Sequence, residues 1–345
     1  MAVPEPARKT AGILLDVRVP GRPTFAVLKS LGADWTDPAD RSAVMGGQKI
    51  PGPLHELGHP IVSHTAATFI TGEDQDVKRE SISGLTNPVW WKVKTNRWRG
   101  AVYQDPNGIF WLCAADLRRE GERTDFYKQF MAEVERSGPA GFLPTEDDQA
   151  RLRLELAEAR LDEWERRIHC DAGEALVAAM DTKSADFTIA SLTGDQPLCA
   201  VKVEVDLVND DDPAQSVAEV LITIERLDWG QADLAEESDI IVLAAIQPDE
   251  QAWDVINLGG HPLYTLTMGA AELESLVGSH EPTATPGRTC AGTISHYAHK
   301  SRITEGAILG KGVRSLCGTW FVPRQDAELL PTCPSCEALH RNLRS

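Results

Sequence analysis

The sequence predicts an α+β protein in three parts: an N-terminal mixed domain with an antiparallel hairpin, a central domain with a long helix and an antiparallel sheet, and a small C-terminal module. Three observations predict this. A capped helix begins after Thr145, the apolar period changes from helical to two over residues 184–260, and a C-x-x-C lies near the C-terminus. We place the parts at 13–140, 141–278 and 279–345, after a loose tail at 1–12.

Composition and charge limit the possible partners. Hydrophobic residues make up 42% and charged residues 25%, as in ordinary globular proteins. The formal net charge of −18 repels nucleic acids and anionic membranes, so an RNA contact needs a local basic patch. We find no apolar run that suits a secretory leader or a membrane span. Seven cysteines, an odd number, suit a reducing cytoplasm. We therefore expect a cytoplasmic protein without a membrane partner.

The N-terminal domain carries most of the aromatic residues. The stretch from Asn87 to Ala115 predicts a hairpin, in which "VWWKVKTNRWRGAVY" and "IFWLCAA" are strands and residues 105–108 form the turn. "TDFYKQFMAEVERSG" then predicts a short amphipathic helix that ends at Gly138, and residues 137–144 form a linker.

The long helix has a defined beginning. Thr145 can cap it, and the acidic residues 146–148 suit the positive end of the helix dipole. We expect Gly173 to end or interrupt the helix. The residues predicted to form its apolar face are Leu154, Leu161, Trp164 and Ile168.

Four strands are predicted to follow. "CAVKVEVDLV" and "AEVLITIERL" alternate apolar with polar residues, and "DIIVLAAIQP" and "WDVINL" continue the sheet, the first of them as a central strand. The loop that contains Asp210, Asp211 and Asp212 lacks the spaced ligands of a calcium loop, so we expect a solvated turn. Residues 278–293 form a second linker.

The C-terminal module carries a candidate zinc site. Cys333 and Cys336 form the C-x-x-C, and fifteen residues separate them from Cys317, which Gly318 follows. This is the half-spacing of a zinc ribbon. We choose His296 as the fourth ligand. Four such ligands leave no open position on Zn²⁺, so the site is predicted to be structural. The alternatives are His299, Cys290 or His340 as the fourth ligand, unrelated buried thiols, or a redox C-x-x-C.

Residues 294–340 also resemble a small bacterial family of zinc-finger-like proteins of unknown function. The resemblance is carried by His296-Tyr297, the basic stretch to Ile303, "LCG" at 316–318, "FVP" at 321–323 and "PTCPSC" at 331–336. It implies the same four ligands, and it implies no activity.

A second candidate site is "HELGH" at residues 55–59, which has the letters of a zinc protease. In such enzymes a helix presents two histidines to zinc and the glutamate is the general base. Here these residues are His55, Glu56 and His59, with His64, Glu73 or Glu80 as a third ligand. Pro60 disfavours helical geometry at His59. We therefore prefer a loop whose histidines bond to the backbone, with a metalloprotease as the alternative.

The third candidate is the basic hairpin at residues 90–103. Aromatic and basic side chains alternate there, from Trp90 to Tyr103, as in proteins that stack single-stranded RNA. The alternative is that the tryptophans pack in a core. Residues 87–127 resemble RelE/ParE-like toxins, which implies an RNA-facing set of Arg97, Arg99, Tyr103, Arg118 and Arg119. In that reading Arg99, Tyr103 and Arg118 are the catalytic candidates, and no metal is needed.

The sequence thus favours a zinc-binding bacterial cytoplasmic protein that recognises RNA or a macromolecular partner through residues 90–103, with a toxin-like or defence-associated role. Two alternatives stay open. One is an HExxH metalloprotease, and the other is a structural or adaptor protein without chemistry.

Overall fold

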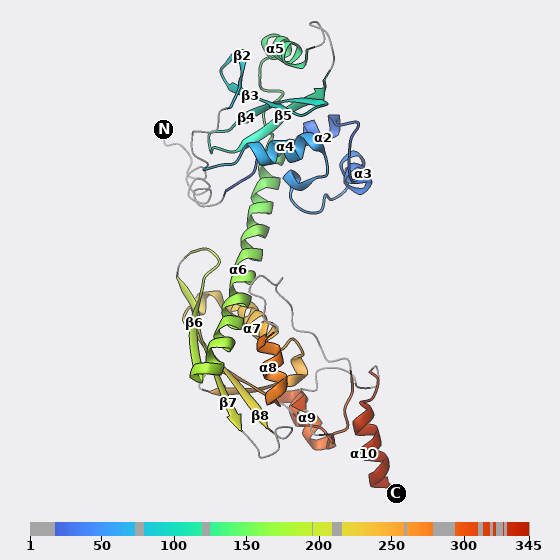
Figure 1. The fold of residues 1–345 in the computed structure, drawn as a ribbon, viewed down its shortest axis with the longest axis vertical. Coiled ribbons are helices and arrows are strands. Elements are labelled where there is room, and N and C mark those ends of the chain that lie inside the picture. The colour runs from blue at the N-terminus through green and yellow to red at the C-terminus, as the bar shows by residue number, and fades with distance from the viewer. Residues whose placement is uncertain are drawn as a thin grey trace. The chain divides into compact units, whose positions relative to one another are not determined.

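A computed structural model describes residues 18–72, 79–118, 125–194, 196–208, 216–258, 261–278 and 294–344, apart from 310–312, 318–319, 322–326 and 328–329 (Figure 1). The chain divides into two compact units, residues 1–157 and 158–345, and the division falls inside one helix. The predicted tail at 1–12 and the Asp210–Asp212 loop lie outside the described residues. The division into three domains stays a prediction.

The N-terminal unit is built on a mixed five-stranded sheet in the order β1-β5-β4-β3-β2, in which β1 is parallel to β5 and the other pairs are antiparallel. The strands are β1 (Arg22–Pro23), β2 (Ser81–Thr86), β3 (Val89–Lys94), β4 (Trp98–Gln104) and β5 (Phe110–Leu117). The helices are α2 (Phe25–Ser30), α3 (Pro38–Gly46), the 3₁₀ turn η1 (Leu54–Glu56), α4 (Pro60–Thr68) and α5 (Phe126–Ser137).

Helices cover both faces of this sheet. On β4 and β5, Val102 and Leu112 point into a core formed with α2, α3 and α4, whereas Ala101 and Trp111 point into a second core with α5. Figure 1 shows α2 and α4 on one side and α5 on the other. The outer strand β2 is irregular: its pairing with β3 shifts register, and Gly84 has a φ of 93°.

The predicted hairpin is a three-stranded meander. The segment "VWWKVKTNRWRGAVY" was predicted as one strand, but it folds into β3 and β4. Thr95 makes the turn, because its hydroxyl accepts a hydrogen bond from the Trp98 amide at 3.1 Å and its own amide donates to the Trp98 carbonyl at 3.0 Å. The helix that follows is confirmed as α5, capped by Asp125 and ended by Gly138 with a φ of 78°.

The long helix is α6 (Glu146–Thr182), and its predicted cap is present. The Thr145 hydroxyl accepts from the Asp148 amide at 3.3 Å, and Asp148 Oδ2 accepts from the Thr145 amide at 2.7 Å, which is the reciprocal geometry of a capping box. Trp164 and Ile168 are buried as predicted, but Leu154 is 60% exposed.

Gly173 does not end α6, contrary to the prediction. The side chains on either side of it, including Ala172 and Leu176, lie in the core of the C-terminal unit. Their packing outweighs the cost of about 1 kcal/mol that an internal glycine imposes on a helix.

The C-terminal unit contains an antiparallel sheet in the order β6-β7-β8-β10-β9. Its strands are β6 (Ser184–Ala190), β7 (Pro197–Val208), β8 (Val217–Arg226), β9 (Trp253–Leu258) and β10 (His261–Gly269). The helical elements are η4 (Trp229–Gln231), α7 (Ala232–Ile246), η5 (Glu250–Ala252), α8 (Ala270–Gly278), α9 (Lys300–Leu309) and α10 (Pro334–Arg344), and a small hairpin joins β11 (Val313–Arg314) to β12 (Trp320–Phe321).

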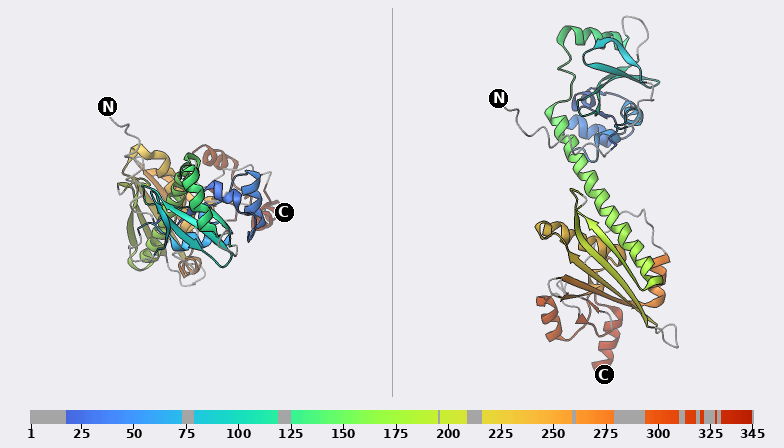
Figure 2. Two further views of the ribbon diagram at one scale, coloured as in Figure 1. Left: turned by 90° about the horizontal axis from the view of Figure 1, so that it is seen from above. Right: turned by 90° about the vertical axis from the view of Figure 1, so that its left-hand side faces the viewer.

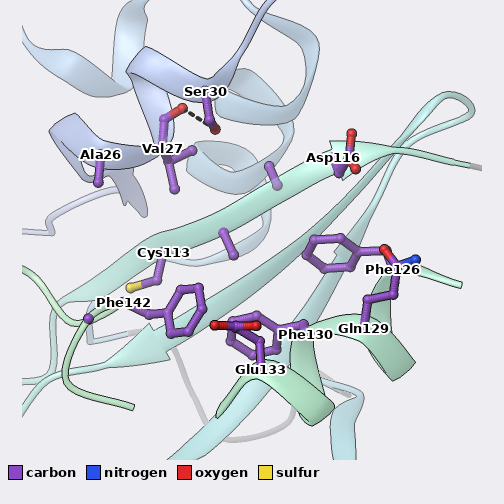
Figure 3. Close-up of a pocket in the computed structure, with 13 residues that line it drawn as sticks. Ala26, Val27, Ser30, Cys113, Asp116, Phe126, Gln129, Phe130, Glu133 and Phe142 are labelled. Atoms are coloured by element: carbon purple, nitrogen blue, oxygen red, sulfur yellow. Dashed lines mark hydrogen bonds between the residues drawn. The ribbon is translucent and has the colours of Figure 1, made fainter. Parts of the chain in front are cut away.

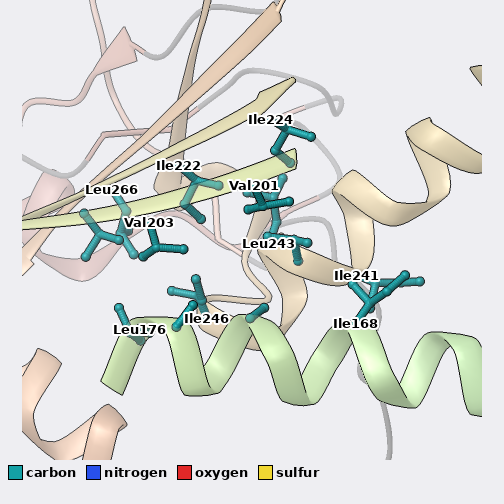
Figure 4. Close-up of a cluster of buried hydrophobic side chains, with 14 of the residues drawn as sticks. Ile168, Leu176, Val201, Val203, Ile222, Ile224, Ile241, Leu243, Ile246 and Leu266 are labelled. Carbon is teal, nitrogen blue, oxygen red and sulfur yellow. The ribbon is translucent and has the colours of Figure 1, made fainter. Parts of the chain in front are cut away.

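One face of this sheet is buried, as the alternation predicted. Val203 and Ile222 point toward α6 and α7, whose Ile168, Leu176 and Ile246 complete the core (Figure 4). The pairing is regular over β7 and β8, from Cys199 opposite Arg226 to Val208 opposite Val217. Figure 2 shows α6 lying along this sheet.

The segment "DIIVLAAIQP" is not a strand. It belongs to α7, which is buried over most of its surface, from Ala235 through Ser238 and Asp239 to Ile246. A helix that is apolar on most sides lacks the 3.6-residue pattern, so its sequence resembles a buried strand. "WDVINL" is confirmed as β9.

In the part of the chain that the structure describes, no helix has both the length and the apolar character needed to cross a membrane.

Candidate metal centre

Three segments of the chain bring His296, Cys317, Cys333 and Cys336 together. Cys317 lies in the turn between β11 and β12, Cys333 directly precedes α10, and Cys336 lies in the first turn of α10. His296 follows Ser295, which forms a parallel bridge with Thr332. This bridge places the histidine beside the C-x-x-C.

Backbone hydrogen bonds fix these segments to one another. The Cys333 amide donates to the Ser295 carbonyl at 2.8 Å, and the Ser295 amide donates to the Pro331 carbonyl at 2.9 Å. The Leu316 amide donates to the Tyr297 carbonyl at 2.6 Å, which holds the Cys317 turn against the histidine segment. The donors are thus positioned by the backbone as well as by their own contacts.

The distances between the donor atoms suit a tetrahedral ion. Cys317 Sγ and Cys336 Sγ lie 3.5 and 3.7 Å from His296 Nδ1, Cys333 Sγ lies 4.0 Å from Cys317 Sγ, and all four atoms lie within 4.8 Å of one another. Zn–S bonds of about 2.3 Å and Zn–N bonds of about 2.0–2.1 Å at tetrahedral angles place S and N about 3.6 Å apart, and S and S about 3.8 Å apart. The residues present therefore can hold a metal ion such as zinc.

The surroundings also suit a bound cation. Cys336 is fully buried, Cys333 is 9% exposed, and the Ser315 hydroxyl lies 3.1 Å from Cys317 Sγ, where it can hydrogen-bond to a thiolate. Burial raises the pKa of the Cys336 thiol, whereas a coordinated cation acts in the opposite direction and deprotonates it. None of the three cysteines forms a disulfide, and the 4.0 Å between Cys317 Sγ and Cys333 Sγ is about twice a disulfide bond length.

The alternative fourth ligands lie elsewhere. His299 Nδ1 makes a 2.7 Å hydrogen bond with Ser301, and the His340 ring packs against Tyr297 at 4.6 Å. Cys290 lies outside the described residues. Among the residues that the structure describes, His296, Cys317, Cys333 and Cys336 are the one group with metal-binding geometry.

The protease-like motif is not helical, so it lacks the geometry with which such a protease presents two histidines to zinc. His55 and Glu56 lie in the short 3₁₀ turn η1, and the chain breaks direction before His59, which is the N-cap of α4. His59 Nδ1 accepts from the Ile61 amide at 3.3 Å, and Nε2 lies 2.9 Å from the Ala33 carbonyl. With both nitrogens engaged and only 1% of its surface exposed, His59 is not placed to bind zinc.

The other residues named for a protease site do not complete it. His55 Nε2 lies 3.8 Å from Glu56, and burial lowers the pKa of both His55 and His59. His64 is exposed on α4, and Glu80 pairs with Lys92 and Lys94. Glu73 lies outside the described residues.

Two of the three tryptophans of the basic hairpin are buried, and Trp91 is half-buried against the core formed with α2, α3 and α4. Trp90 is fully buried and Trp98 is 3% exposed, and each belongs to one of the two cores, so the alternative core role is correct for them. Arg97 pairs with Asp34 at 2.7 Å, and Arg99 Nη1 donates to the Thr95 and Trp98 carbonyls. These cations stabilise turns of the protein.

The proposed catalytic set is not assembled by the contacts of the described residues. Tyr103 packs against Trp90, and burial raises the pKa of its phenol. Arg118 is exposed just after β5, and Arg119 lies outside the described residues.

A hollow of about 410 Å³ lies between β5, α2 and α5, and the residues that line it include Phe126, Phe130, Phe142, Asp116 and Glu133 (Figure 3). Its one thiol belongs to Cys113, which is 4% exposed. Burial raises the pKa of this thiol well above its ordinary value, so it is a poor nucleophile.

Comparison with known proteins identifies only the C-terminal segment. Residues 291–343 match the model of a family described as "Protein of unknown function (DUF3039)". All four candidate ligands lie inside the matched segment, so the predicted resemblance of this segment to a family of unknown function is confirmed. No curated protein and no solved structure matches the chain. The RelE/ParE resemblance of residues 87–127 thus finds no support.

Proposed function

We propose that His296, Cys317, Cys333 and Cys336 bind one structural zinc ion, and that this ion folds the C-terminal module. The observation that carries the proposal is the approach of four donors, from three segments, to within 4.8 Å of one another. Three thiolates and one imidazole are the ligands of structural zinc sites, and such a shell leaves no position for water or substrate.

The ion is expected to supply much of the stability of the module. The hairpin of β11 and β12 is two residues long in each strand, and α9 and α10 are short. A module of this size has little core of its own, whereas structural zinc contributes about 10–16 kcal/mol in small zinc-dependent folds. Removing zinc should therefore unfold residues 295–343 before the rest of the C-terminal unit.

Metal analysis of the purified protein tests the proposal. We expect one zinc per chain, and Cys336→Ser should lose it. Cys170→Ser is the matched control, because Cys170 is also a buried cysteine of the same unit but lies on α6. Hydrogen exchange should show that a chelator exposes residues 295–343.

Two results contradict the proposal. One is a wild-type protein without zinc whose Cys333 and Cys336 are joined by a disulfide. The other is a Cys336→Ser protein that keeps its full complement of zinc.

A further inference from the structure

A pocket of about 270 Å³ lies in the C-terminal unit, on the side of α7 that faces the ends of β8, β9 and β10. Part of its wall is apolar, with Ile240, Leu243, Trp253 and Val255. The rest is polar and comes from four different elements: Arg226, Glu236, Asp239, Glu250 and Tyr264. None of these residues belongs to the candidate metal centre.

Asp239 provides a buried acceptor in this pocket. Its side chain is 8% exposed, and Oδ2 accepts a hydrogen bond from the Tyr264 hydroxyl at 3.0 Å. Oδ1 is buried and has no hydrogen-bond partner among the described residues. A buried carboxylate oxygen without a partner costs free energy, so it is a ready site for a ligand that brings a donor.

Arg226 provides a buried donor beside it. Its Nε is buried and has no partner in the described part of the chain. Its Nη2 lies 3.8 Å from Glu236 and 3.9 Å from Asp239, distances that are too long for hydrogen bonds. The pocket thus presents an acceptor and a donor that the described residues leave unpaired, next to an apolar wall.

The charged residues that line the pocket indicate which kind of ligand it favours. Three carboxylates (Asp239, Glu236 and Glu250) face one guanidinium, so the pocket favours a cation. Trp253 and Tyr264, which also line the pocket, bring aromatic rings that can attract a cation. The unpaired Arg226 Nε requires an acceptor on the same ligand, and the apolar wall requires an aliphatic group. A volume of about 270 Å³ admits one residue-sized ligand.

We propose that this pocket binds an α-amino compound, with its ammonium on Asp239, the adjacent carbonyl oxygen on Arg226 and an aliphatic side chain against Leu243 and Val255. A free amino acid and the N-terminal residue of a peptide share this chemistry. The excess of carboxylates favours the peptide N-terminus, because that ligand carries a net positive charge.

Calorimetric titration of the full-length protein tests the proposal with L-leucinamide as the probe. We expect saturable 1:1 binding, lost with N-acetyl-L-leucinamide, which keeps the shape and removes the ammonium. Stronger binding of L-leucine than of L-leucinamide identifies the free amino acid as the ligand class, and the reverse identifies the peptide N-terminus.

Variants of the lining residues test whether the ligand binds in this pocket. Asp239→Asn should weaken it about tenfold or more, because a hydrogen bond to a charged group contributes about 1.5–3 kcal/mol. Asp233→Asn is the matched control, because Asp233 is exposed on the same helix and does not line the pocket. Ile240→Trp, which fills the pocket from a partly exposed position, should abolish binding even if Asp239→Asn fails to fold.

The proposal is overturned if folded wild-type protein shows no saturable binding of L-leucinamide or L-leucine. It is equally overturned if the acetylated probe binds as well, or if Ile240→Trp leaves the affinity unchanged. None of these binding measurements depends on the zinc content, so the proposal can fail or succeed independently of the metal site.

Discussion

Arg22 on β1 and Glu155 on α6 form a buried ion pair, with Arg22 Nη1 2.7 Å from Glu155 Oε2 and side chains that are 1% and 5% exposed. Glu155 Oε1 also accepts from the Leu54 amide at 3.1 Å and from Arg151 Nε at 2.7 Å. One carboxylate thus joins the start of α6 to the edge of the sheet and to the first residue of η1.

Glu155→Gln should destabilise the N-terminal unit by about 3–5 kcal/mol, because it leaves the Arg22 guanidinium buried without a counter-charge. Urea unfolding followed by tryptophan fluorescence measures this. Glu146→Gln is the control on the same helix: its pair with Arg153 is 81% and 51% exposed, so it should change stability by less than about 1 kcal/mol. Similar losses for both variants would contradict the role of Glu155.

His59→Ala should destabilise the N-terminal unit by about 1–2 kcal/mol through loss of the α4 cap, and it should leave the zinc content unchanged. His59→Asn, which can still cap, should recover part of the loss. His64→Ala, on the exposed side of α4, is the control. A fall in zinc content with His59→Ala would revive the protease interpretation.

The buried His59 predicts that the stability of the N-terminal unit depends on pH. Burial lowers the pKa of His59 below its ordinary 6.5, and that of His55 likewise, so below pH 6.5 the unfolded chain binds more protons than the folded chain. Stability should therefore fall as the pH drops below 6.5. Thermal unfolding between pH 5 and 8 should show a smaller fall for His59→Asn, and identical profiles would argue against a buried neutral imidazole.

Asp239→Asn should stabilise the C-terminal unit at neutral pH. Burial raises the pKa of Asp239 from 3.8 to about 6, although Tyr264 and Arg226 act against the rise and Glu236 adds to it. The folded state then binds more protons between pH 4 and 6, so stability falls as the pH rises through that window.

The gain at pH 8 should be up to about 3 kcal/mol, from two pKa units at 1.36 kcal/mol each, and it should vanish near pH 3.5. Differential scanning calorimetry of Asp239→Asn against Asp233→Asn measures it. A gain that does not change with pH would have another cause.

Gly100→Ala should destabilise the N-terminal unit by about 1–3 kcal/mol. A Cβ at Gly100 meets the side chains of Leu112 and Val93 at 2.7 Å, inside a packed core that cannot yield easily. Gly141→Ala is the matched control, because nothing lies within 4 Å of its Cβ. Chemical denaturation compares the two, and equal stabilities would show that the core at Gly100 is loosely packed.

Local signals predicted much of the fold. The cap at Thr145, the end of α5 at Gly138 and the alternation in β7 and β8 are short-range patterns that tertiary packing reinforced. Gly173 was wrongly predicted to end α6, because the packing around it outweighs its low helix propensity. The segment of α7 was wrongly predicted as a strand, because a helix that is buried on most sides lacks the helical pattern of apolar residues.

The candidate sites also differ in how far the sequence predicted them. The grouping of His296 with the three cysteines was predictable, because the C-x-x-C spacing restricts how thiols can meet one ion and the family resemblance implied the histidine. The Arg226–Asp239 pocket was not predictable, since its polar groups come from strands and helices far apart in sequence and their burial is known only from the fold. For His59, the proline that follows indicated a non-helical position, but the contact with Ala33 came from tertiary structure.

The irregular strand β2 has a consequence for the behaviour of the protein at high concentration. A long, straight outer strand offers a row of amides and carbonyls on which another molecule can extend the ladder. The register shift of β2 and the left-handed Gly84 interrupt that row. The N-terminal unit therefore carries a built-in barrier to edge-to-edge aggregation, although its sheet is rich in β-forming residues.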